Sequence, residues 1–123
     1  MMSWNFNNFS KEEFLCQHCG AEGISVKLVE RLQKLRDLYG KPMIVSSGYR
    51  CDLHPIEAKK KIGGTHNEGL AVDILIEKED AYELLKLAFK LKFYGIGVNQ
   101  KGDNRFLHLD ISEKFNRPNI WSY

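Results

Sequence analysis

The sequence predicts an α+β domain in which two or three helices flank one mainly antiparallel sheet. Three observations favour this class. Residues 25–40 and 78–91 repeat apolar side chains at helical spacing. Residues 41–49 and 70–76 contain short apolar runs that are typical of strands. Residues 93–111 contain two more such runs around the turn QKGDN, which indicates a hairpin.

The individual elements have start and stop signals of their own. Ser10 precedes Glu13 by three residues, which is the capping-box spacing and predicts a short helix there. The helix over 25–40 ends in Gly40, a residue that commonly terminates helices. The predicted order is therefore helix, strand, strand, helix and hairpin. At 123 residues the chain is long enough for one core, and we expect a single domain over 1–123.

Composition limits the classes of partner. A formal net charge of +2 with interspersed signs gives no basic stripe, so we expect no nucleic-acid partner. The run KKK at 59–61 is interpreted as a solvated loop. No apolar run approaches the length of a membrane span, and the N-terminal segment lacks a signal-peptide pattern. The sequence thus predicts a protein that is cytoplasmic as synthesised, and we expect a monomer.

Two segments carry the residues most suited to chemistry. GGTHNEGLAVDI contains His66 and Asp73, and strand alternation in RFLHLDI places His108 and Asp110 on one face. Asp73 lies in an apolar run, where an unpaired carboxylate costs several kcal/mol. Two imidazoles and one carboxylate with a fourth position left for water form the open set of a catalytic zinc ion. Taken singly, each residue is also compatible with a surface histidine or a loop-capping aspartate.

Together these segments resemble a known family. SSGYR, GGTHNEGLAVD and FLHLDI occur in the order seen in the zinc D-Ala-D-Ala carboxypeptidases of peptidase M15 type, within the superfamily of lysostaphin-type peptidases and the hedgehog domain. The resemblance runs from FSKEEF to RPNIWSY. It implies a hedgehog/D,D-peptidase-like fold, zinc bound by His66, Asp73 and His108, and a peptidoglycan peptide as substrate. It also implies that Arg50 faces the substrate carbonyl or carboxylate.

The sequence departs from this family at the general base. Many relatives carry an acidic residue three positions before the last zinc-binding histidine, where this chain has Arg105. Asp110 is the first candidate for a replacement, with Glu68 and Asp103 behind it. Asp110 is equally suited to orienting a ligand imidazole through its other ring nitrogen.

The cysteines suggest a second metal site. An odd count of three argues against a closed disulfide framework. CQHC and CDLH together offer four soft ligands for a structural zinc ion. The alternative is three reduced thiols and a surface histidine. The four residues concerned are Cys16, Cys19, Cys51 and His54.

Two functions of different classes follow. The first is a zinc metallopeptidase that hydrolyses a peptide bond of bacterial peptidoglycan, as a D,D-carboxypeptidase or an endopeptidase. The missing signal peptide then favours a phage or prophage enzyme, released by lysis or carried on a phage particle. The second is a zinc-containing binding or structural module of the same fold without catalysis, which Arg105 favours.

Overall fold

The computed structural model describes residues 4–59 and 64–123. Its elements are the 3-10 helix η1 (Lys11–Phe14), α1 (Val26–Tyr39), β1 (Ile44–Ser47), the 3-10 helix η2 (Glu57–Lys59), β2 (Ala71–Leu75), α2 (Lys78–Lys90), β3 (Gly95–Asn99), β4 (Phe106–Asp110) and β5 (Asn119–Ser122). The predicted α+β class is confirmed. Most of the KKK run, at 60–61, lies outside the described residues.

The strands form one sheet with the order β1-β2-β4-β3-β5. The pairs β1–β2, β2–β4 and β3–β4 are antiparallel, as predicted for a mainly antiparallel sheet with a hairpin. β5 was not predicted; it pairs in parallel with β3, which makes the sheet mixed. The last strand of the chain is thereby placed at the sheet edge, separated by β3 from β4, the strand that carries His108.

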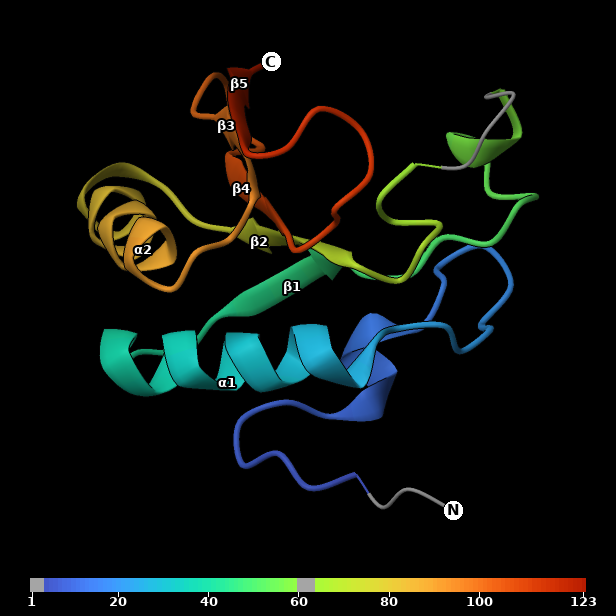
Figure 1. Cartoon of the computed structure of the whole chain (residues 1–123), viewed down its shortest axis with the longest axis horizontal. Coiled ribbons are helices and arrows are strands. Elements are labelled where there is room, and N and C mark those ends of the chain that lie inside the picture. The colour runs from blue at the N-terminus through green and yellow to red at the C-terminus, as the bar shows by residue number, and fades with distance from the viewer. Residues whose placement is uncertain (1–3, 60–63) are drawn as a thin grey trace.

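The two faces of the sheet differ. Leu107 and Leu109 of β4 belong to the buried core together with side chains of α1 and α2. His108 and Asp110, at the alternate positions, point to the opposite face. In Figure 1 the two long helices lie on one side of the sheet, and the segments 48–59, 64–70 and 111–118 lie on the other. The helices therefore supply the core, and the loops surround the polar face.

Local signals in the sequence explain the ends of two helices. The Glu13 carboxylate accepts the backbone N–H of Ser10 at 2.6 Å, as the capping-box spacing predicts for η1. Gly40 ends α1 with φ +75°, the left-handed conformation that glycine adopts at low cost. The buried apolar side chains form one cluster, whose first member in the sequence is Phe9 and whose last is Leu109. That the whole range 1–123 is a single domain stays a prediction.

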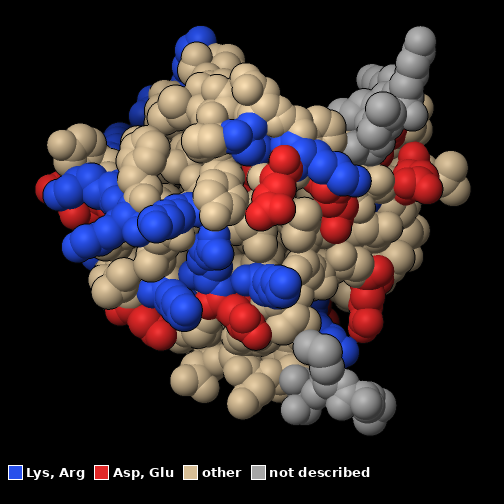
Figure 2. All heavy atoms as spheres, viewed as in Figure 1, with Lys and Arg blue, Asp and Glu red and all other residues tan. Residues whose placement is uncertain are grey.

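The surface carries charges of both signs. Figure 2 shows acidic side chains among the basic ones on the face that it presents. Within the described ranges, none of the helices has the length and apolar character needed to cross a membrane.

Gly95 gives a test of the packing on the polar face. A Cβ atom there would overlap with Asp110 Oδ2 and Arg117 Nε, and Asp110 is fully buried. We expect Gly95→Ala to destabilise the protein by about 1–3 kcal/mol because this ion pair has to shift. At an unhindered position the same change stabilises by about 0.4–1 kcal/mol, through the unfolded chain. Urea unfolding measures whether the free energy of unfolding falls or rises in Gly95→Ala. A rise would contradict the packing described.

Candidate metal centre

The three predicted metal ligands converge on the polar face of the sheet. Asp73 of β2 pairs directly with His108 of β4, and His66 lies on the turn that precedes β2. One ligand atom from each lies within 4.8 Å of the others. Asp73 Oδ1 is 3.2 Å from His66 Nε2 and 3.2 Å from His108 Nδ1. Ligands about 2.0–2.1 Å from a tetrahedral zinc ion lie about 3.3 Å apart, so these spacings fit one zinc ion.

Hydrogen bonds on the far side of each ring fix the two imidazoles. His66 Nδ1 lies 2.8 Å from the carbonyl oxygen of Gly48, and His108 Nε2 lies 2.7 Å from Asp110 Oδ2. Both partners accept, so these nitrogens carry the protons, and a neutral ring then has only a lone pair at its other nitrogen. Both lone pairs point at the Asp73 carboxylate. The space between them therefore favours a cation, either a bound metal ion or, without one, a second proton on the ring.

The electrostatics of the site favour positive charge. Burial alone would raise the pKa of Asp73, but hydrogen bonds with His108 and His66 hold this pKa well below its usual range. Burial alone would lower the pKa of His108, but contacts with Asp110 and Asp73 raise it. The site thus stabilises a cation next to two buried carboxylates.

Arg50 lies beside the ligands and is held from several directions. Its guanidinium is 3.4 Å from Asp73 Oδ2 and 3.6 Å from Glu57 Oε2. Its Nε donates to Ser47 Oγ at 3.2 Å. Glu57 is 3% exposed and also accepts the backbone N–H of Gly64 at 2.8 Å, so it is a fixed partner. Arg50 is therefore fixed beside the proposed metal ligands, while its role toward a substrate stays a prediction.

Asp110 stands behind His108 and is paired on both oxygens. Arg117 donates to it at 3.0 Å through Nε and at 2.8 Å through a terminal nitrogen. Burial alone would raise the pKa of Asp110, but the bonds with His108 and Arg117 lower it. The Arg117 guanidinium lies 4.9 Å from the ring centre of Trp121. The ring centres of Trp121 and His108 are 5.1 Å apart. Asp110 is thus an ionised partner of the imidazole on the side away from Asp73.

A cleft of about 570 Å³ opens onto these groups. Asp73 is the one acidic side chain on its lining within the described residues. Aromatic side chains form much of the wall. The lining residues are Arg50, Ile56, Gly64, Thr65, His66, Asp73, Phe106, His108, Phe115, Arg117, Trp121 and Tyr123.

The other predicted carboxylates lie elsewhere. Glu68 accepts the Ser112 hydroxyl at 2.8 Å and lies 3.8 Å from Lys114 Nζ. Asp103 is exposed in the turn between β3 and β4. Arg105, at the position where an acidic residue was expected, donates to the carbonyl oxygen of Gly102. None of these side chains lines the cleft.

The comparison with known families agrees with this geometry. Residues 7–110 match the sequence profile of peptidase M15. The chain belongs to the peptidase M15 family. Members of this family are zinc-dependent peptidases, and the match includes His66, Asp73 and His108. No curated protein matches the chain.

Several residues of this M15 site were not predicted from the sequence. Glu57, Arg117, Trp121 and Tyr123 all contact the site or line its cleft. The last three lie beyond the residues matched to the family. Charge alone could have nominated Arg117 as a partner for a buried aspartate, but only the parallel pairing of β5 with β3 brings the segment to the cleft.

The cysteines form a second cluster. The sulfur atoms of Cys16, Cys19 and Cys51 lie within 4.8 Å of one another. Burial raises the pKa of the Cys16 thiol, but backbone N–H groups, first that of Cys51, outweigh it and lower the pKa to about 7. His54, the predicted fourth ligand, is not within this set. Three of the four predicted residues are therefore brought together.

Proposed function

We propose that the protein is a zinc metallopeptidase that hydrolyses a peptide bond of bacterial peptidoglycan, as a D,D-carboxypeptidase or an endopeptidase. The observation that carries the proposal is the convergence of His66, Asp73 and His108 at a cleft beside Arg50. Three protein ligands with an open fourth position are the pattern of catalytic zinc, whereas structural zinc is normally closed by four. The family assignment supports peptide hydrolysis as the reaction class.

The residues at the metal site have two roles, as ligands and as groups that orient the ligands. His66 Nε2, Asp73 Oδ1 and His108 Nδ1 would bind it, and Gly48 and Asp110 hold the two rings in the required tautomers. When bound, zinc polarises the scissile carbonyl and lowers the pKa of a water molecule toward neutrality.

Arg50 is assigned to the substrate oxygen. Its planar guanidinium is suited to a developing oxyanion or to the terminal carboxylate of a peptide. The contacts with Glu57, Asp73 and Ser47 fix the side chain before substrate arrives, which lowers the entropic cost of using it. Arg117 is an inferior candidate because it pairs with Asp110 behind His108, whereas the Arg50 guanidinium lies 3.4 Å from the proposed ligand Asp73.

Asp110 is proposed as a positioning residue rather than the general base. It is fully buried, and both oxygens are engaged by His108 and Arg117. A base must reach the proton it removes, directly or through one water. Asp110 contacts the ring nitrogen remote from Asp73, which is the geometry for orienting a ligand. Glu68 and Asp103 remain weaker candidates because neither lines the cleft.

A second function, a binding or structural module that keeps the metal site, is favoured by one observation. Asp73, the single acidic side chain on the described lining, is itself a proposed ligand, so this lining offers no separate Asp or Glu as a base. Such a module would bind the same wall peptide without cutting it. Cytoplasmic synthesis, a phage setting and the monomeric state stay predictions.

A digest of purified peptidoglycan separates these functions. The zinc-loaded protein is incubated with sacculi of several peptide types, and the soluble products are analysed by mass spectrometry. We expect loss of a terminal D-alanine or a cut cross-link, abolished by a chelator and restored by zinc. Sedimentation with sacculi but no new fragment from any type would instead support the binding module.

A further inference from the structure

The three-cysteine cluster lies outside the cleft and has no part in the function proposed above. Cys16 and Cys19 lie on the turn after η1, and Cys51 directly follows Arg50. The turn is closed by two backbone hydrogen bonds, from Gly20 N to Cys16 O at 2.7 Å and from Cys16 N to Ala21 O at 3.0 Å. The backbone N–H of Cys51 donates to Cys16 Sγ at 3.3 Å. A Cys-x-x-Cys turn with a backbone donor aimed at its first sulfur is suited to thiolate ligation of a metal.

We propose that Cys16, Cys19 and Cys51 bind a second, structural zinc ion that fixes the segment carrying Arg50. Zn–S bonds of about 2.3 Å place two sulfurs of one ion at most about 4.6 Å apart, and the three sulfurs already form a set of about this size. The candidates for a fourth ligand are the two imidazoles that neighbour these thiols in the sequence, His18 between Cys16 and Cys19 and His54 three residues after Cys51. His18 and His54 have ring centres 6.3 Å apart, and His54 Nδ1 accepts a backbone N–H from Ile56, which leaves Nε2 free to bind.

The segment 48–51 connects the two metal sites through alternate backbone groups. On one edge, Gly48 O holds His66 Nδ1, and the N–H of Arg50 donates to His66 O at 3.1 Å. On the other edge, the N–H groups of Tyr49 and Cys51 donate to Phe14 O and Cys16 Sγ. A metal ion on the cysteines would therefore fix the backbone that positions both Arg50 and His66.

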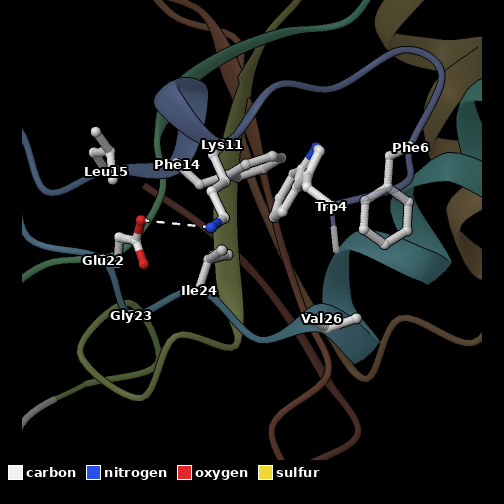
Figure 3. A pocket seen from close by; sticks show the side chains of 9 residues that line it. All are labelled: Trp4, Phe6, Lys11, Phe14, Leu15, Glu22, Gly23, Ile24 and Val26. Carbon is white, nitrogen blue, oxygen red and sulfur yellow. Dashed lines mark ion pairs between the residues drawn. The ribbon is translucent and has the colours of Figure 1, made fainter. Parts of the chain in front are cut away.

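Hydrogen bonds already join this part of the chain to β1 and the segment 48–51, from the Gln17 side chain to Ser46 O and from the N–H of Tyr49 to Phe14 O. The segment that leads from the turn to α1 is tied to η1 by an exposed ion pair. Figure 3 shows the ion pair of Lys11 and Glu22 across a pocket lined by Trp4, Phe14 and Ile24. Its atoms are 3.7 Å apart, and its side chains are 47% and 69% exposed, so it adds little stability. Metal ligation by Cys16, Cys19 and Cys51 would add a strong cross-link between the turn after η1 and the segment 48–51.

The test counts the two sites separately. The wild-type chain, Cys19→Ser and His108→Ala are purified in zinc, and metal content is measured by elemental analysis. Cys19 is exposed, so its replacement leaves the core intact. We expect two zinc ions per chain in the wild type, one in each variant, and none in the double variant. After cobalt substitution, a thiolate-to-metal charge-transfer band should persist in His108→Ala and vanish in Cys19→Ser.

The importance of fixing Arg50 rests on the proposed function. The number of zinc ions bound per chain does not depend on that function. Hydrogen exchange at the amides of Arg50 and Cys51 should accelerate at least 10-fold in Cys19→Ser. Equal zinc content in Cys19→Ser and the wild type, or a cobalt protein without the thiolate band, would overturn the second site. Failure of peptidoglycan cleavage with both zinc ions present would defeat only the peptidase.

Discussion

Replacing His108 by alanine is expected to abolish tight zinc binding at the His66–Asp73–His108 site and, with it, peptidase activity. The change removes one of three protein ligands and leaves Asp73 buried beside a single imidazole. Loss of a residue that only supports a ligand costs about 10–100-fold in affinity, so loss of the ligand itself should cost more than about 100-fold. Competition with a chelator of known affinity measures the change.

The control for this variant is Tyr82→Ala, which removes an exposed aromatic ring of α2 that does not line the cleft. It should leave zinc affinity at the three-ligand site unchanged. Circular dichroism establishes whether each variant is folded. Unaltered zinc affinity at this site in folded His108→Ala protein would contradict the ligand assignment.

Replacing Asp110 by asparagine is expected to weaken both the metal site and the fold. Asparagine keeps the size but removes the charge that His108 and Arg117 share. Zinc affinity should fall about 10–100-fold because the ring of His108 loses its charged acceptor. The free energy of unfolding should fall by about 3 kcal/mol because Arg117, whose side chain is 10% exposed, loses a buried ionic partner.

Asp103→Asn is the matched control, because the same change is made at an exposed turn. It should leave affinity, stability and turnover near those of the unaltered protein. A different result for Asp110→Asn would reassign the residue. Normal zinc affinity with turnover reduced at least about 100-fold would make Asp110 the general base.

Much of the fold follows from local patterns. The apolar spacing in 25–40 and 78–91 predicted α1 and α2, and alternation in RFLHLDI placed His108 and Asp110 on one face of β4. These properties depend on neighbours in the sequence, so periodicity captures them. The three metal-ligand candidates could be nominated for the same reason, together with the cost of burying Asp73.

Long-range pairing explains what could not be predicted. Residues 119–122 have no alternating pattern that distinguishes them from a tail, yet they form β5 by parallel pairing with β3. This pairing places Trp121 on the wall of the cleft. Arg117, which precedes β5, donates a hydrogen bond to Asp110. The orienting contacts of Asp110 likewise required the structure, because strand alternation gives a face but not the partner of each oxygen.

Anomalous diffraction at the zinc absorption edge, from crystals grown with zinc, tests the central assignment most directly. The account predicts a peak about 2.0–2.1 Å from His66 Nε2 and His108 Nδ1 and about 2.0–2.2 Å from a carboxylate oxygen of Asp73, with the remaining position open to the cleft. A fully zinc-loaded crystal with no peak among these three side chains would contradict it.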